Sequence, residues 1–233
     1  AFYSELTRKI GALPDVRSAA VSSWIARFGN PEEPFILIAE NGGRAGMTYT
    51  FSESVSPAYF RTMGIEVLAG RTFSGEDAFR SPRVAVVNQT FADRFLGGSQ
   101  AVGRKIDLPA GNPRPGMDDE SWTVIGVVSD VRVSGLTRPN APEPILYTSS
   151  IQEESPFMSL IVDSPRADDP ELTRQIQDII LGLDENLPVY FIMTMEEVIE
   201  GHIYPFRMMA QFFLLVGLMA LFLAAIGVYG MLA

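Results

Sequence analysis

Few residues in this chain could do chemistry, and their spacing does not favour it. His202 is the only histidine among 233 residues, and there is no cysteine. A zinc site needs several nitrogen or sulfur ligands, and a Ser–His–acid arrangement would have to use this one imidazole, shortly before the apolar end of the chain. The missing cysteines also exclude disulfides and thiolate catalysis. We therefore interpret His202 as a structural or interfacial residue.

The remaining candidates for chemistry are accounted for by loops and helix ends. The acidic residues 118–120 could hold a hard cation, but their spacing fits no calcium loop, so a solvated loop is expected. Asp169 is placed to cap a helix. The glycine-rich segments 97–103 and 111–116 lack the spacing of phosphate-binding and dinucleotide-binding loops. The glycosylation pattern at 88–90 falls at a predicted helix start and is interpreted as incidental. The sequence thus predicts no catalytic residue, metal site or cofactor site.

The charge of the chain excludes one class of partner. The net charge is -10, and every acidic residue lies before Phe206. A domain this acidic would be repelled by a phosphate backbone, so nucleic acid is not expected as a partner.

A chain of this length forms one or two domains, and because it begins and ends inside structured elements we expect a piece of a longer protein.

The end of the chain predicts a membrane helix. Phe212 to Ala233 is 22 residues without a charge, which as a helix would span roughly 33 Å, enough for a bilayer core. The alternative, a buried core helix, is usually shorter and carries some polar residues. Small residues recur at steps of three, four and three, which places them on one face as a helix-packing stripe: Gly217, Ala220, Ala224 and Gly227. The competing interpretation is that glycine and alanine are common in membrane helices.

An acidic segment leads into this run. Glu196, Glu197 and Glu200 precede it, and Arg207 is the only nearby base. By the positive-inside rule this favours a non-cytoplasmic position for the approach.

The preceding residues predict alternating helices and strands. Helices are expected at 2–13, at 56–65, from Asn88 to 96 and from Asp169 onward. Ser56, Asn88 and Asp169 would cap the last three, and Pro57 and Pro170 would occupy the first position of their helices. Phe91 and Phe95 would lie on one face of the third helix. Strands are expected at 16–25, 35–40, 47–55, 83–87, 104–108, 121–131, 157–163 and 187–193.

One motif occurs twice. Glu-Leu-Thr-Arg at 5–8 opens a helix that leads to Leu13-Pro14, and the same four residues at 171–174 open a helix that leads to Leu187-Pro188. The match is either chance between amphipathic helices or a trace of two related α/β halves, with the middle of the chain inserted between them.

Several segments in order resemble one family. They are VSPAYFRTMGIEVLAGRTFSGED (55–77), VAVVNQTFADRFLGG (84–98), VGRKIDL (102–108) and WTVIGVVSDVRVSGL (122–136). Together they resemble the MacB-like periplasmic core domain of bacterial ABC-transporter permeases. LPVYFIMTMEEVI (187–199) and AAIGVYGML (224–232) are similar to the junction into the second membrane helix of an FtsX-like permease. The part before Met47 matches least.

The resemblance implies the fold class. It predicts an α+β, two-lobed extracytoplasmic domain, with a porter-like α/β lobe from both ends and an inserted mixed lobe, followed by one transmembrane helix. The porter-like lobe would comprise residues 1–56 and 136–205, the inserted lobe 57–135, and the helix 206–233. The first of four permease helices would precede Ala1, and the third and fourth would follow Ala233.

The resemblance also implies a function. It predicts a non-catalytic permease subunit of a bacterial ABC transporter that transmits ATP-driven motion across the membrane to the extracytoplasmic domain, in efflux or envelope export. Residues 1–205 would lie outside the inner (cell) membrane, and Glu196 to Arg207 would form a coupling stalk. ATP is expected on a separate or fused nucleotide-binding domain. Expected partners are the membrane, an ABC ATPase subunit, a permease homodimer or pseudo-dimer and, in some relatives, a periplasmic adaptor.

Two other functions stay open at the level of sequence. A membrane-anchored sensor whose extracytoplasmic domain binds a ligand would carry a signalling module after the helix. An anchored enzyme would need convergent polar groups in a cleft. The sequence does not identify a transported substrate.

Overall fold

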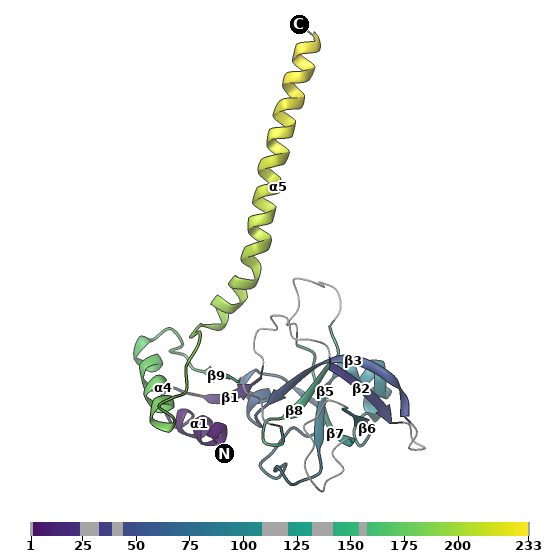
Figure 1. The fold of residues 1–233 in the computed structure, drawn as a ribbon, viewed down its shortest axis with the longest axis vertical. Coiled ribbons are helices and arrows are strands. Elements are labelled where there is room, and N and C mark those ends of the chain that lie inside the picture. Colours follow the sequence, from purple (N-terminus) through teal and green to yellow (C-terminus); the bar gives the residue numbers. More distant parts are fainter. Residues whose placement is uncertain are drawn as a thin grey trace. The chain divides into compact units, whose positions relative to one another are not determined.

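The computed structural model describes residues 2–23, 33–38, 44–108, 121–131, 142–153 and 158–232. The chain divides into two compact units, Ala1–Val189 and Tyr190–Ala233, and each is described by itself. Figure 1 labels the helices and strands along the chain. The first unit combines helices with a sheet, and the second contains one long helix. The mixed α and β fold expected from the sequence is confirmed.

The described strands of the first unit belong to one nine-stranded sheet, part of which closes into a ring. The ring strands are β2 (Glu33–Ile38), β3 (Arg44–Val55), β5 (Val84–Asn88), β6 (Lys105–Asp107), β7 (Ser121–Val128) and β8 (Ile145–Ser149). The ring closes because β2 pairs with both β3 and β6. Pairing is parallel between β3 and β8 and between β5 and β7, and antiparallel at the other ring contacts. A closed ring leaves no open edge among these strands.

Three further strands extend the ring. They are β4 (Val67–Gly70), which pairs with β7, and β1 (Ser18–Ser22) and β9 (Ser159–Asp163), of which β1 joins β3 and β9 pairs with β1. Figure 1 shows β1 and β9 running from the ring toward α1 and α4. β3 ends at Val55, next to the predicted lobe boundary, and belongs to the ring together with β5, β6 and β7. The division into lobes at 1–56, 57–135 and 136–205 stays a prediction.

Alternate residues of β5 and β8 supply two separate cores. Ala85, Val87 and Leu146 join a cluster with Trp122. The intervening residues, among them Val86 and Tyr147, join a second cluster that packs against the helix α2 (Tyr59–Thr62). Because successive side chains of a strand point to opposite faces, these strands are buried on both sides, and β5 is apolar without interruption from Val84 to Val87.

A short helical segment closes the first cluster. It comprises α3 (Gln89–Phe91), the π-helical turn η1 (Ala92–Leu96) and the 3₁₀ turn η2 (Gly98–Gln100). The Asn88 side-chain oxygen accepts a hydrogen bond from the Phe91 amide at 3.0 Å, so the predicted cap is confirmed. The rings of Phe91 and Phe95 lie 5.1 Å apart and each lies within 5.2 Å of Phe35, which confirms their shared face.

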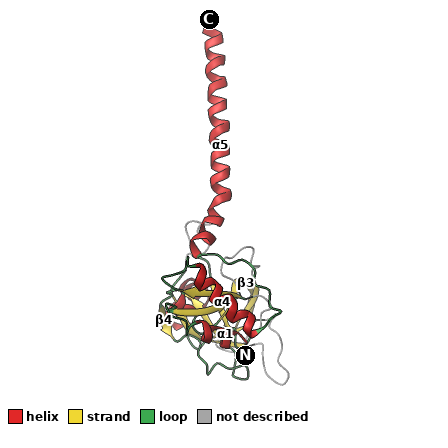
Figure 2. Cartoon of the chain, turned by 90° about the vertical axis from the view of Figure 1, so that its left-hand side faces the viewer, coloured by secondary structure: helices red, strands yellow, loops and turns green. Residues whose placement is uncertain are grey.

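Two helices cover β1 and β9. α1 (Phe2–Ile10) and α4 (Pro170–Leu183) lie side by side (Figures 1 and 2) and form a third core with Ala19 of β1. The repeated motif places Leu6 and Leu172 at equivalent positions, and both are buried. Asp169 caps α4 by accepting a hydrogen bond from the Glu171 amide at 2.9 Å, as predicted. Both copies of the motif therefore place their leucine in a buried position, and Leu6 does so within the core formed with Ala19.

Two local expectations are wrong. The helix predicted at 56–65 is only α2, and Ser56 does not cap it, because its hydroxyl oxygen accepts a hydrogen bond from the Val21 amide of β1 at 3.0 Å. The strand predicted at 187–193 is absent from the described structure, which has no regular element there. Pro188 has no amide to donate to a ladder, and Tyr190 and Phe191 are 67% and 87% exposed.

Candidate coupling helix

The second unit is dominated by α5 (Met195–Leu232), a helix of 38 residues. A helix of that length is roughly 57 Å long. Its start is fixed by a reciprocal pair of hydrogen bonds. The Thr194 hydroxyl accepts from the Glu197 amide at 3.2 Å, and the Glu197 carboxylate accepts from the Thr194 amide at 2.7 Å. This is a capping box, which satisfies two amides that the first turn leaves without helical partners.

The capping box gives one predicted stalk residue a defined local role. Glu197 holds the start of α5, and the Thr-x-x-Glu spacing that signals this is present in the sequence, although our sequence analysis missed it. Glu196 lies in the same first turn, where a negative charge complements the helix dipole. Glu200 and Arg207 are exposed on the same helix. Their role as a coupling stalk stays a prediction.

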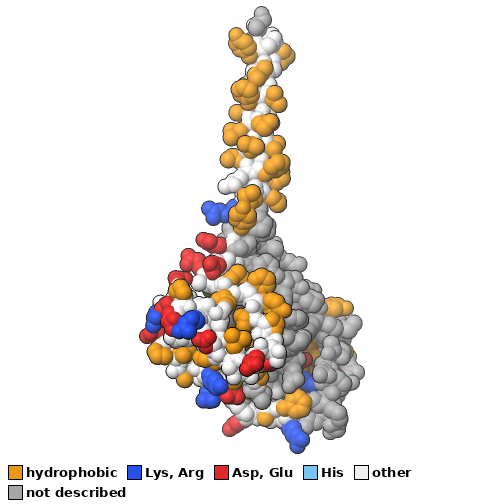
Figure 3. All heavy atoms as spheres, turned by 60° about the vertical axis from the view of Figure 1, so that its left-hand side comes forward, with side chains coloured by type: hydrophobic (Ala, Val, Ile, Leu, Met, Phe, Trp, Pro, Cys, Tyr) orange, Lys and Arg blue, Asp and Glu red, His pale blue; other side chains and the backbone are white. Residues whose placement is uncertain are grey.

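Most of α5 is apolar and unburied. Among the described residues, one helical segment, Arg207–Leu232, is long and apolar enough to cross a membrane, with 26 residues and a mean hydropathy of 2.5. None of the apolar window is buried, whereas the core helix of a soluble protein would be mostly buried. Figure 3 shows apolar side chains along the visible sides of this helix. The observation favours the membrane interpretation of the terminal run over a core helix.

The predicted packing stripe lies within this segment. Its four members are exposed helical residues: Gly217, Ala220, Ala224 and Gly227. A Cβ atom added at Gly217 or Gly227 would meet nothing within 4 Å. Both positions therefore leave room for the backbone of a second helix to approach closely. Their use in helix packing stays a prediction.

None of the residues that the sequence singled out for chemistry forms a reactive site in the part of the chain that is described. Residues 109–120, which contain the acidic cluster and the glycine-rich segment 111–116, lie outside the described residues, as does the side chain of His202. Among the residues that are described, no group of three or more metal-ligating side chains comes together.

Asn88, in the glycosylation pattern, is fully buried. Its side chain accepts hydrogen bonds from the Phe91 and Ile145 amides and donates to Asp130 and to the Glu143 carbonyl. These contacts join β5 to the start of β8 and give the residue a structural role.

The comparisons with known proteins agree with this architecture. The sequence matches the MacB-like periplasmic core domain family over residues 2–179, a span that ends within α4. A search of curated proteins found no match. The structure is similar to the periplasmic region of MacB from Actinobacillus actinomycetemcomitans, with a TM-score of 0.55 and 14% identity over 85% of this chain and 81% of that one.

A second solved structure shares the fold. It is the extracellular domain of the noncanonic ABC-type transporter YknZ from Gram-positive bacteria, with a TM-score of 0.54 and 13% identity over 82% of this chain and 89% of that one. At these identities the likeness concerns the fold. The family match covers well over half of the chain and confirms the resemblance drawn from the sequence. This chain therefore belongs to the MacB-like periplasmic core domain family.

Proposed function

We propose that this chain is the extracytoplasmic domain and following membrane helix of a non-catalytic permease subunit in a bacterial ABC transporter. It would transmit ATP-driven motion from the cytoplasm to its outer domain, in efflux or envelope export. The observation that supports this most directly is the order of parts: a MacB-like periplasmic core domain, followed by an apolar helix that is not buried. The relative YknZ is itself described as a noncanonic ABC-type transporter.

The geometry of α5 suits transmission of motion. The helix is continuous from the capping box at Thr194 to Leu232, and its apolar segment begins at Arg207. Pro205 lacks an amide and so removes one backbone hydrogen bond, but the helix runs through it, and displacement of the membrane segment would displace the first turn. Glu196, Glu197 and Glu200 occupy that end. ATP would be hydrolysed by a separate or fused nucleotide-binding domain, with a second permease copy or a related chain alongside.

The packing stripe offers the sharpest test of this function. In the full-length permease assembled with its ATPase in proteoliposomes, Gly227→Leu should lower the coupled ATPase activity several-fold, because a bulky side chain would keep a neighbouring helix away. The outer domain should stay folded, since a Cβ at Gly227 meets nothing within 4 Å. The rate of ATP hydrolysis by the assembled complex and the circular dichroism of the purified permease measure the two effects.

The matched control is Val228→Leu, one residue away and off the stripe. It adds bulk to the same turn and should leave coupling unchanged. If Gly227→Leu and Val228→Leu give equal ATPase activities, the packing stripe has no role in coupling. If the purified permease fails to assemble with any ATPase, the proposed function itself is wrong.

A further inference from the structure

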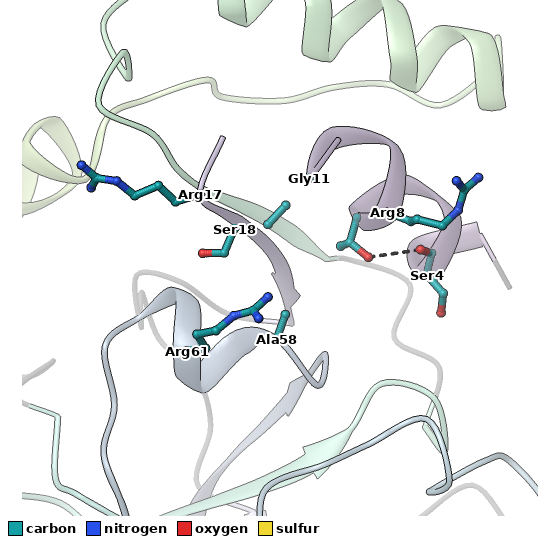
Figure 4. Close-up of a pocket in the computed structure, with 9 residues that line it drawn as sticks. Ser4, Arg8, Gly11, Arg17, Ser18, Ala58 and Arg61 are labelled. Carbon is teal, nitrogen blue, oxygen red and sulfur yellow. Dashed lines mark hydrogen bonds between the residues drawn. The ribbon is translucent and has the colours of Figure 1, made fainter. Parts of the chain in front are cut away.

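A hollow of about 320 Å³ in the first unit gathers arginines from three separate elements. Arg8 lies on α1, Arg17 just before β1, and Arg61 on α2 (Figure 4). Figure 4 shows the Arg61 guanidinium beside Ala58, with the side chains of Arg8 and Arg17 extending away from each other on opposite sides of the hollow. None of the described residues that line it is acidic. In a chain with a net charge of -10, this is a local concentration of positive charge.

Two of these charges have no acidic partner among the described residues. Arg17 forms an ion pair with Asp163, with 3.5 Å between nitrogen and oxygen. Arg8 and Arg61 form no ion pair with any described residue. Arg8 in the last turn of α1 also complements the helix dipole. The interaction of Arg8 with the helix dipole does not explain why Arg17 and Arg61 line the same hollow. It also does not explain why none of the described residues that line the hollow is acidic.

A nearly buried hydroxyl completes the set of donors. Ser18 is 6% exposed, lines the same hollow, and its hydroxyl makes no hydrogen bond within the described structure. By contrast, the Thr7 hydroxyl is already engaged, since it donates to the Tyr3 carbonyl at 3.0 Å. The Ser18 hydroxyl is therefore available to donate a hydrogen bond to a ligand in the hollow.

We propose that this hollow binds a phosphate-bearing group. Guanidinium groups bind phosphate oxygens through paired charge-assisted hydrogen bonds, which a compact ammonium group cannot do as well. A phosphomonoester carries about -1.5 to -2 charges at neutral pH, which matches the two arginines that have no acidic partner among the described residues. The volume of about 320 Å³ admits a small headgroup or sugar phosphate. The phosphate could belong to a soluble compound or to a lipid headgroup.

Calorimetric titration with glycerol 3-phosphate tests the site. The 233-residue chain is held in an uncharged detergent at about pH 7.5, where the monoester is mostly dianionic, and sodium chloride keeps the ionic strength constant. We expect saturable binding that Arg61→Gln weakens by about tenfold or more, because a charge-assisted hydrogen bond is lost. Arg80→Gln, an equal charge change at an exposed residue outside the hollow, should change the dissociation constant by less than about twofold.

A second titration distinguishes the source of the phosphate. Short-chain phosphatidic acid presents the same monoester from the micelle, and phosphatidylcholine serves as the control lipid. Equal affinities for glycerol 3-phosphate and phosphatidic acid would assign a soluble ligand, and a lipid preference that Arg61→Gln abolishes would assign a headgroup. The proposal is overturned if neither probe binds, or if Arg61→Gln and Arg80→Gln weaken binding equally. Should Arg61→Gln unfold the domain, Arg8→Gln provides the same comparison.

Discussion

At the scale of single residues, an ion pair between a half-exposed guanidinium and a buried carboxylate holds the loop after β4. The Arg71 guanidinium donates to both oxygens of Asp77, at 2.7 and 2.8 Å, and the Ser74 amide donates to the same carboxylate at 2.8 Å. The Asp77 side chain is 5% exposed. The hydrogen bonds from Arg71, joined by that from Ser74, hold the pKa of Asp77 below its ordinary value of 3.8.

We predict that Asp77→Asn destabilises the first unit at neutral pH by about 1–3 kcal/mol, because it removes the charge that Arg71 binds. A lowered folded-state pKa means that the stabilisation is fully present above pH 3.8 and is lost as the pH falls through the folded-state pKa. The difference from the unsubstituted chain should therefore shrink below pH 3.8. Urea unfolding across this pH range measures it, with Asp168→Asn as an exposed control. A constant difference at all pH values would contradict a role for the ion pair.

At the scale of elements, the features that the sequence predicted correctly are those set by residues close together in the chain. The caps at Asn88 and Asp169 were predictable because each side chain bonds an amide two or three residues later. The strands β4 and β8 were missed, since they depend on partners far along the chain. The strand expected at 187–193 failed for the same reason: β-branched and aromatic residues favour a strand only where a neighbour is available.

The arginine hollow could not have been predicted in this way. Arg8, Arg17 and Arg61 are brought together only when α1 and α2 pack beside β1. No spacing in the sequence relates them. The family resemblance, by contrast, depends on several motifs in order and was accessible from the sequence alone.

The pairing of β4 with β7 depends on two glycines that face each other. Gly70 and Gly126 are partners in register. A Cβ at Gly126 would lie 2.1 Å from the Arg71 carbonyl oxygen, and one at Gly70 would lie 2.2 Å from that of Ile125. Both contacts are with backbone, which cannot rotate away.

We predict that Gly126→Ala destabilises the first unit by about 1–3 kcal/mol, the cost of overpacking a tight contact. Gly75→Ala is the matched control, because a Cβ there meets nothing within 4 Å, and it should change stability by less than about 0.5 kcal/mol. Chemical denaturation of both variants gives the comparison. Equal stability of the two variants would show that β4 can move away from β7 at little cost.

At the scale of the whole molecule, the central question is which side of the membrane the first unit occupies. The acidic approach at Glu196, Glu197 and Glu200 and the family match both favour the outer side. These 233 residues contain no cysteine, so a cysteine introduced among them reports its own position once any cysteine elsewhere in the full-length permease has been replaced. Ala167 is suited to this because it is exposed in the turn before α4.

We predict that Ala167→Cys in the full-length permease reacts with a charged, membrane-impermeant maleimide in intact spheroplasts, to the same extent as after lysis. The reagent would reach it directly from outside, because the first unit would be extracytoplasmic. Ala220→Cys, inside the apolar segment Arg207–Leu232, should react in neither preparation, since a charged reagent does not enter the hydrocarbon layer. Labelling of Ala167→Cys only after lysis would reverse the orientation. Labelling of Ala220→Cys in intact spheroplasts would place that part of α5 in water, and the proposed transmission through a membrane-spanning helix would then lose its physical basis.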